Sequence, residues 1–214
     1  MRHLRINSAN YEDFIRLASE EIKNSKIVAY PTETFYGLGV RYDDEDALRR
    51  LYSIKKRPAD KTMPLIIGEF AQLSLLVDST NEIEQLLIKE FWHGPLTILF
   101  HARDGLSEFI VKDKKVAVRL PSCKIARDIS ILSNLPITST SANISSMPPP
   151  MDAMTILRYF GDNIDVVVDD GFTPGGMPST IVEVSNNAIL VKRHGILNVE
   201  KFCLKMGIKL IRNQ

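Results

Sequence analysis

An apolar run that leads into hydroxyls and glycines, IVAYPTETFYGLG, occupies residues 27–39. Its first four residues predict a short buried strand, which Pro31 ends because proline has no N–H to donate to a sheet. The two glycines allow a ligand to approach the backbone closely, and Thr32 and Thr34 offer hydroxyls at the carboxyl end of the strand. A turn whose glycines serve geometry alone is the alternative, because a single GxG is a weak signal.

Helical and strand patterns alternate along the rest of the chain, with short connections. Apolar residues at helical spacing predict helices at 11–22, 44–56, 81–92, 123–133 and 153–160, with a last helix beginning near Asn198. Short apolar runs predict strands at 64–67, 96–101, 116–120, 136–140, 165–169, 179–184, 188–193 and 208–211. This alternation predicts an α/β fold, a single domain over 1–214 with a large mixed sheet flanked by helices.

Composition excludes several classes of protein. Hydrophobic residues make up 44% of the 214 residues and charged residues 25%, which is typical of a globular chain and excludes disordered and fibrous classes. Cys123 and Cys203 lie far apart and form no CxxC pair, so they predict neither a zinc site nor a disulfide. The N-terminus lacks the apolar core of a signal peptide, and no apolar run approaches the roughly 20 residues that span a bilayer. We therefore expect a cytoplasmic protein with no membrane partner.

Residues 49–61, RRLYSIKKRPADK, carry six cations and one carboxylate. The net charge of the whole chain is only +1, so an anion site has to come from local clustering of this kind. Helical spacing puts Lys55 beside the apolar stripe of the predicted helix, where it can point into a cleft. Cations fixed at this density suit a polyphosphate, whereas a solvated basic face is the alternative.

Two further segments place small donors at strand ends. The hydroxyls and amide of STSANISS at 139–146 follow a β-rich stretch and suit phosphate oxygens or a ribose, with an ordinary Ser/Asn turn as the alternative. GGMPST at 175–180 puts hydroxyls at the start of a strand. Arg193 ends the partner strand, where it can stack on a base, bind phosphate, or stand as a plain surface arginine.

In this order, the segments resemble those of the threonylcarbamoyl-AMP synthase family, also called the YrdC-like domain. The sequence contains no GxSxG, HExxH, Walker A or dinucleotide-binding fingerprint that would favour another class. The resemblance covers about residues 10–197, and eight segments in register make it specific. They are YPTETFYGLG at 30–39, KKRPADKTMPLII at 55–67, FWHGPLTILF at 91–100, VAVRLP at 116–121, ITSTSANIS at 137–145, DDG at 169–171, GGMPSTIVEV at 175–184 and ILVKRHG at 189–195.

The resemblance implies a twisted α/β sheet around a large, concave, basic groove. It implies an L-threonylcarbamoyladenylate synthase, a nucleotidyltransferase that makes threonylcarbamoyl-AMP and pyrophosphate from L-threonine, bicarbonate and ATP. The product would serve the threonylcarbamoyladenosine modification of tRNA, through a downstream tRNA threonylcarbamoyl transferase. Mg²⁺ would accompany ATP as a cofactor, held mainly by the phosphates and by no metal ligands of the protein.

The family signatures also assign residues. The Lys-x-Arg and Ser-x-Asn signature falls on Lys55, Arg57, Ser141 and Asn143. These four residues and Arg193 would bind ATP, with Lys55 and Arg57 as the catalytic pair that neutralises the phosphates. The threonine site would consist of Thr32, Arg119 and Ser179. Because a carbamate and a phosphate are both anions, most of the rate would come from fixed positive charge and positioning.

Two departures from the family pattern stand out. Some branches carry a histidine shortly after the PLI strand that helps to hold threonine, and Gly68 follows Ile67 here. Longer members add a C-terminal domain, and we expect none in this chain because it ends about 15 residues after its last match.

Two other functions are consistent with these segments. The first is a non-catalytic module that binds double-stranded RNA or tRNA in the basic groove. The near-neutral net charge counts against it, so we expect at most a weak RNA contact. The second is a carbamoyl-transfer enzyme with a different acceptor. It would need a different threonine pocket, and Gly68, in place of the histidine of some branches, leaves this function open.

Overall fold

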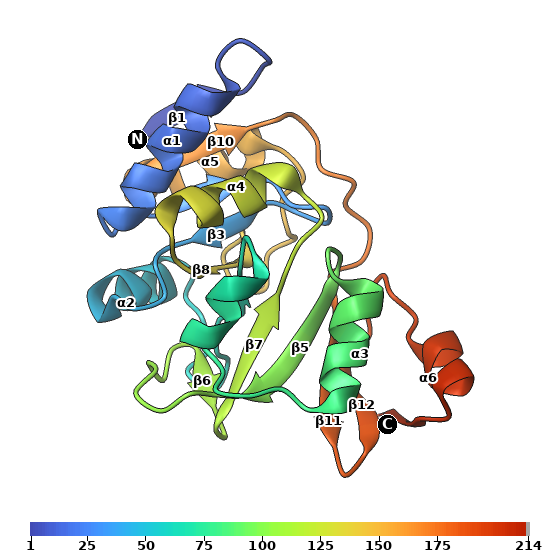
Figure 1. The fold of residues 1–214 in the computed structure, drawn as a ribbon. Coiled ribbons are helices and arrows are strands. Elements are labelled where there is room, and N and C mark those ends of the chain that lie inside the picture. The colour runs from blue at the N-terminus through green and yellow to red at the C-terminus, as the bar shows by residue number, and fades with distance from the viewer. Residues whose placement is uncertain (213–214) are drawn as a thin grey trace.

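The structure is a computed structural model and describes residues 1–212. Its strands form two sheets, and Figure 1 shows the smaller in the upper half of the view and the larger in the lower half. The order in the smaller sheet is β1 (Arg2–Arg5), β10 (Val166–Asp169), β2 (Val28–Tyr30), β3 (Gly37–Gly39) and β9 (Thr140–Ser141). The order in the larger sheet is β13 (Lys209–Arg212), β12 (Ala188–Arg193), β11 (Thr180–Ser185), β5 (Leu96–His101), β7 (Lys115–Arg119), β4 (Leu65–Ile66) and β8 (Ile137–Thr138), with β6 (Val111–Lys112) also paired to β7.

Helices cover the smaller sheet because their apolar residues recur on one side. In α1 (Tyr11–Lys23), the buried residues Ile15, Ala18 and Ile22 follow helical spacing. This helix packs against α4 (Lys124–Ser133), and the two lie side by side in Figure 1. Together with the buried residues of β2 and β10 they form one hydrophobic cluster. The other helices of the described chain are α2 (Glu45–Ile54), α3 (Glu82–Phe91), α5 (Ala153–Phe160) and α6 (Glu200–Met206), with 3₁₀ turns at Phe70–Leu75 and Gly161–Asn163.

The larger sheet is built around β5. That strand pairs in parallel with β11 and antiparallel with β7, and most of its side chains are buried. Strands β11 and β12 form a hairpin whose turn residues Asn186 and Asn187 have φ of 49° and 56°. Two consecutive positive φ angles define the hairpin turn that matches the twist of the strands. The hairpin brings the start of β11 next to the end of β12, so Ser179 and Arg193 come together.

The two sheets meet at the segment that was predicted as one strand, 136–140. The chain forms β8 in the larger sheet, leaves it at Ser139, and continues as β9 in the smaller sheet. The buried Tyr30 of β2 donates from its hydroxyl to the carbonyl of Thr138, at 2.7 Å. Residues just after this crossing are therefore held between the sheets.

The predicted mixed α/β class is confirmed, and the strands divide between two sheets rather than one. The predicted helices and strands all form, mostly within two residues of the expected bounds. Sequence patterns missed β1, β3, β6 and the 3₁₀ turns at Phe70–Leu75 and Gly161–Asn163, because two to six residues hold too little periodicity. Over residues 1–212, no helix combines the length and apolar character that crossing a membrane requires.

The link between the sheets predicts a difference between two tyrosines. Tyr30→Phe removes a buried donor and leaves the Thr138 carbonyl unpaired, so the free energy of unfolding should fall by about 1–2 kcal/mol. Tyr159→Phe is the control, because its hydroxyl bonds the Pro148 carbonyl at an exposed position. It should change stability by less than about 0.5 kcal/mol. Equal effects in urea unfolding would contradict this account of the junction.

Candidate functional site

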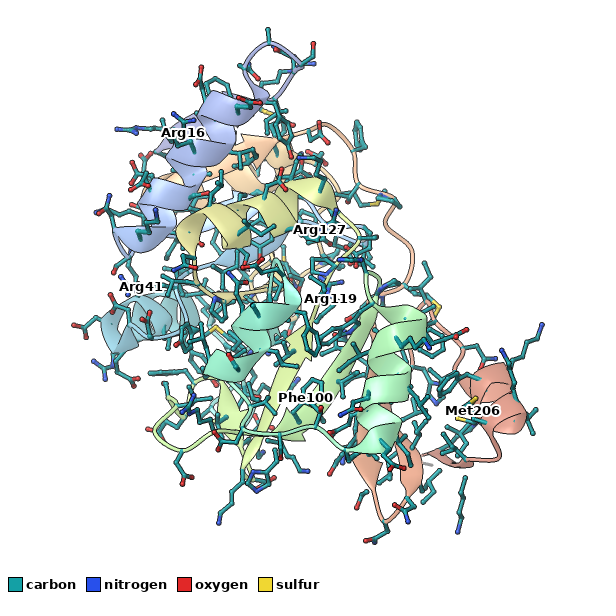
Figure 2. All side chains as sticks on the ribbon, viewed as in Figure 1. Arg16, Arg41, Phe100, Arg119, Arg127 and Met206 are labelled. Carbon is teal, nitrogen blue, oxygen red and sulfur yellow. The ribbon has the colours of Figure 1, made fainter. Side chains whose placement is uncertain are left out.

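A cavity of about 350 Å³ lies where the two sheets meet, and strand ends and loops from both sheets line it. Six of the eight predicted site residues line this cavity: Thr32, Arg57, Arg119, Ser141, Ser179 and Arg193. Lys55 and Asn143 are not among its lining residues. Figure 2 shows Arg119 in the middle of the molecule, between the larger sheet and α4. Segments separated by more than 150 residues in the sequence thus build one site.

Three guanidinium groups converge on the cavity, from Arg57, Arg119 and Arg193. Burial, followed by the charges of Arg119 and Arg57, lowers the pKa of Arg193 to about 10. Burial also lowers the pKa of Arg57. Such shifts mean that the site holds like charges close together and partly away from water. An anion that entered the cavity would relieve this repulsion, so the site is suited to anionic ligands.

Backbone carbonyls fix two of these arginines. Arg57 donates from Nε to the Lys61 carbonyl at 2.9 Å and from Nη2 to the Thr62 carbonyl at 2.6 Å. Arg193 donates from Nε and Nη2 to the Ser179 carbonyl, at 3.1 and 2.7 Å. Planar guanidinium groups held in this way keep further N–H donors for a ligand in a set direction.

Hydroxyl groups complete the cavity wall. The Oγ1 atom of Thr32 donates to the Phe35 carbonyl at 2.6 Å, which orients the side chain. Ser179 Oγ lies 2.9 Å from Thr97 Oγ1 and accepts a bond from Arg193 at 2.9 Å. Thr97 and Ser139 line the cavity but were missed as site residues, although both lie in the family segments quoted above. Each stands at or near a strand end, which is the signal that could have identified them.

Lys55 differs from its predicted place. It is only 2% exposed, and its ammonium donates to the carbonyls of Ser141 and Asn143 at 2.5 and 2.6 Å. The expectation that it points into a cleft is therefore wrong, because the loop 141–145 folds over it. Burial and the nearby Arg57 lower the pKa of Lys55 to about 7, whereas the two carbonyl acceptors favour the charged form. In this structure the side chain holds the loop.

Asn143 also stabilises this loop through hydrogen bonds within it. Ser141 Oγ donates to Asn143 Oδ1 at 2.5 Å, and the amide nitrogen of Asn143 donates to the carbonyls of Ile144 and Met147. The Ser-x-Asn signature is thus an internally bonded turn with Ser141 toward the cavity.

The basic run 49–61 does not act as one charged face. Arg49 pairs with Asp46 at 3.1 Å, and Arg50 pairs with Asp165 at 2.8 Å. Lys55 is buried, and Arg57 is turned into the cavity. Among the described residues, these pairings leave Lys56 and Lys61 as the exposed cations of the run that have no ion pair, whereas Arg49 is exposed but paired. The six cations of this run therefore lie in different environments and do not form the dense cluster expected from the sequence.

Packing explains the glycine at position 68. A Cβ built there would lie 2.5 Å from the Arg127 carbonyl oxygen and 2.8 Å from the Ile131 nitrogen, both in α4. No side chain fits without displacing that helix, so position 68 cannot contribute to the cavity. The residues of this segment that line the cavity are Pro64 and Leu65.

A second, wider hollow of about 730 Å³ lies between residues 6–13 and α4, and it competes as a site only by its size. Its charged lining residues are Glu12, Asp13, Lys124 and Asp170, so acids outnumber cations. It contains none of the predicted site residues, and its charge disfavours phosphates. The arginine-lined cavity is therefore the candidate site.

Comparison with known proteins agrees with this architecture. The family model Sua5_yciO_yrdC, described as "Telomere recombination", matches residues 20–195. The chain belongs to the Sua5/YciO/YrdC family. In fold, it is similar to the crystal structure of Pyrococcus abyssi Sua5 complexed with L-threonine, with a TM-score of 0.88 and 34% identity over 98% of this chain and 62% of that one.

Curated relatives carry a common name. Threonylcarbamoyl-AMP synthase of Pyrococcus abyssi is 37% identical over 188 residues, covering 87% of this chain and 55% of the relative. The chain therefore spans about half the length of that protein. The protein of the same name from Enterobacter sp. is 33% identical over 159 residues, covering 73% of this chain and 84% of the relative.

The place of Lys55 predicts a local effect on the loop. Lys55→Met keeps the volume but leaves the Ser141 and Asn143 carbonyls unpaired, which should cost about 1–3 kcal/mol of stability. Hydrogen exchange should accelerate at the amide of Ser145, which bonds the Lys55 carbonyl. Lys56→Met is the matched control, because its side chain is exposed one residue away. Unchanged exchange in Lys55→Met would show that the ammonium does not hold the loop.

Proposed function

We propose that this chain is an L-threonylcarbamoyladenylate synthase, which makes threonylcarbamoyl-AMP and pyrophosphate from L-threonine, bicarbonate and ATP. The observation that carries the proposal is the convergence of Arg57, Arg119 and Arg193 on one cavity together with several hydroxyls. Two relatives named threonylcarbamoyl-AMP synthase and a similar structure titled as a complex with L-threonine support it.

The chemistry requires such a cavity. The threonine amine adds to bicarbonate with loss of water, and a carboxylate oxygen of the resulting carbamate attacks the α-phosphorus of ATP. The bond from this phosphorus to the bridging oxygen then breaks, and pyrophosphate leaves. Carbamate and triphosphate are both anions, so their approach needs fixed positive charge. Arg57 and Arg193, each anchored by carbonyls, would take the phosphates without moving.

The amino acid would occupy the hydroxyl-lined side of the cavity. Arg119 would pair with the threonine carboxylate, as a planar group suited to two parallel bonds. Thr32 and Ser179, whose hydroxyls are already oriented by their partners, would hold the amine or side-chain hydroxyl. Ser141, which also lines the cavity, would contact the nucleotide. Lys55 and Asn143 enter this account through the loop that they hold, since neither lines the cavity.

Mg²⁺ would be bound through the ATP phosphates. Within residues 1–212, no group of three or more His, Cys, Asp or Glu side chains is placed to hold a metal ion. When bound with ATP, the ion would supply further charge on the leaving pyrophosphate. As parts of the same proposal, the chain works as a single domain in the cytoplasm and passes its product to a tRNA threonylcarbamoyl transferase. The RNA-binding alternative loses its main support, because the basic run is not one open face.

Amino-acid dependence tests the proposed function. Pyrophosphate release from ATP with bicarbonate should require L-threonine. L-serine lacks the side-chain methyl group of threonine and L-alanine lacks both this methyl group and the hydroxyl, so each should support the release poorly. Arg57→Met should lower the rate by about 10²–10³. Arg49→Met is the matched control, because Arg49 is exposed and paired on the surface. Release at the same rate with all three amino acids would contradict the substrate assignment.

A further inference from the structure

Glu33 is a carboxylate beside the cavity that has no part in the account above. Its side chain is 14% exposed, and Oε1 accepts a bond from Nη1 of Arg119 at 3.0 Å. Its Oε2 is buried and has no hydrogen-bond partner among the residues that the structure describes. Within 1–212, the side-chain hydrogen bonding of Glu33 is therefore directed to one guanidinium.

Stability does not explain this arrangement. Removing two charges from water costs hydration free energy that their attraction seldom recovers, so a buried ion pair is weak evidence for stabilisation. The unpartnered oxygen adds a further cost of about 1–3 kcal/mol. A buried polar atom of this kind needs another explanation, and a functional role is one of the common ones.

Arg119 differs from its two neighbours in how it is held. Arg57 and Arg193 are anchored by backbone carbonyls. In the described chain, no backbone carbonyl accepts a hydrogen bond from the Arg119 guanidinium. Its second contact, from Nη2 to Ser139 Oγ, is long at 3.4 Å. Glu33 thus provides for Arg119 what backbone carbonyls provide for the other two arginines.

We propose that Glu33 is a positioning residue, which fixes Arg119 so that its remaining N–H donors take the carboxylate of the amino-acid substrate. This inference rests on the proposed function. A guanidinium has five N–H donors, and the two contacts above leave several for a ligand. Arg119 is only 6% exposed, so the cavity that it lines is where a ligand would reach these donors.

The charge of Glu33 has a second effect that has to be separated from positioning. A carboxylate beside this arginine-lined cavity lowers the attraction of the cavity for every anion, including the ATP phosphates. Positioning of Arg119 instead affects only the ligand that binds Arg119. The ratio of L-threonine affinity to ATP affinity therefore distinguishes the two effects, because the general charge effect acts on both ligands in the same direction.

Calorimetric titration of the full chain with L-threonine and with ATP tests the proposal. In Glu33→Gln, a neutral amide oxygen replaces the carboxylate as the acceptor of the Arg119 bond and weakens it, so L-threonine should bind about tenfold more weakly while ATP affinity stays within about twofold or rises. Glu33→Asp keeps the charge and should recover part of the loss. Glu90→Gln, at an exposed position, is the control and should change neither affinity. Thermal unfolding of each variant checks that it is folded.

A double-mutant cycle locates the effect. In an Arg119→Lys background, Glu33→Gln should cause no further loss of L-threonine affinity. The proposal is overturned if Glu33→Gln leaves both affinities unchanged, if it shifts both alike, or if its effect persists without Arg119. Failure of the unmodified chain to bind L-threonine would instead contradict the proposed function, and the inference would fall with it.

Discussion

Like charges have to be held together for this site to exist. Arg57, Arg119 and Arg193 repel one another across one cavity, and part of that repulsion appears as the lowered pKa of Arg193. In water, flexible side chains would move apart. Here carbonyls of the Lys61–Thr62 segment and of Ser179 hold two guanidinium groups, and Glu33 holds the third. An anion that enters the cavity relieves this repulsion, so the arrangement of the three arginines suits anionic ligands.

The fold supplies these anchors by bringing two sheets together. The crossing at Ser139 joins them, and the β11–β12 hairpin sets Arg193 against Ser179. Lys55 holds the loop that follows the crossing, because its ammonium donates to two backbone carbonyls of that loop. A cation that is fully buried in this way gives the loop a fixed shape rather than a surface charge. The cavity wall depends on this loop, so a residue outside the cavity still shapes it.

Sequence patterns predicted the helices and most strands, and six of the eight predicted site residues line the cavity, because each of these depends on local periodicity or on a recognisable segment. They could not predict the environment of Lys55. Its position beside the apolar stripe follows from helical spacing, but its burial follows from a loop 86 residues away in sequence. The pairing of Arg50 with Asp165 is equally non-local, and it removes a cation from the expected basic face. The reason for a glycine at position 68 is also non-local, because the backbone of α4 lies too close to leave room for a side chain there.

The central claim is that one cavity joins an amino-acid carbamate to the α-phosphate of ATP. Incubation of the chain with ATP, L-threonine and isotopically labelled bicarbonate tests it most directly, with the nucleotide products separated and analysed by mass. The account predicts an adenylate that carries both the bicarbonate label and threonine, formed in equal amount with pyrophosphate and lost when threonine is omitted. Pyrophosphate release without label in any adenylate, or a labelled adenylate formed without threonine, would contradict it.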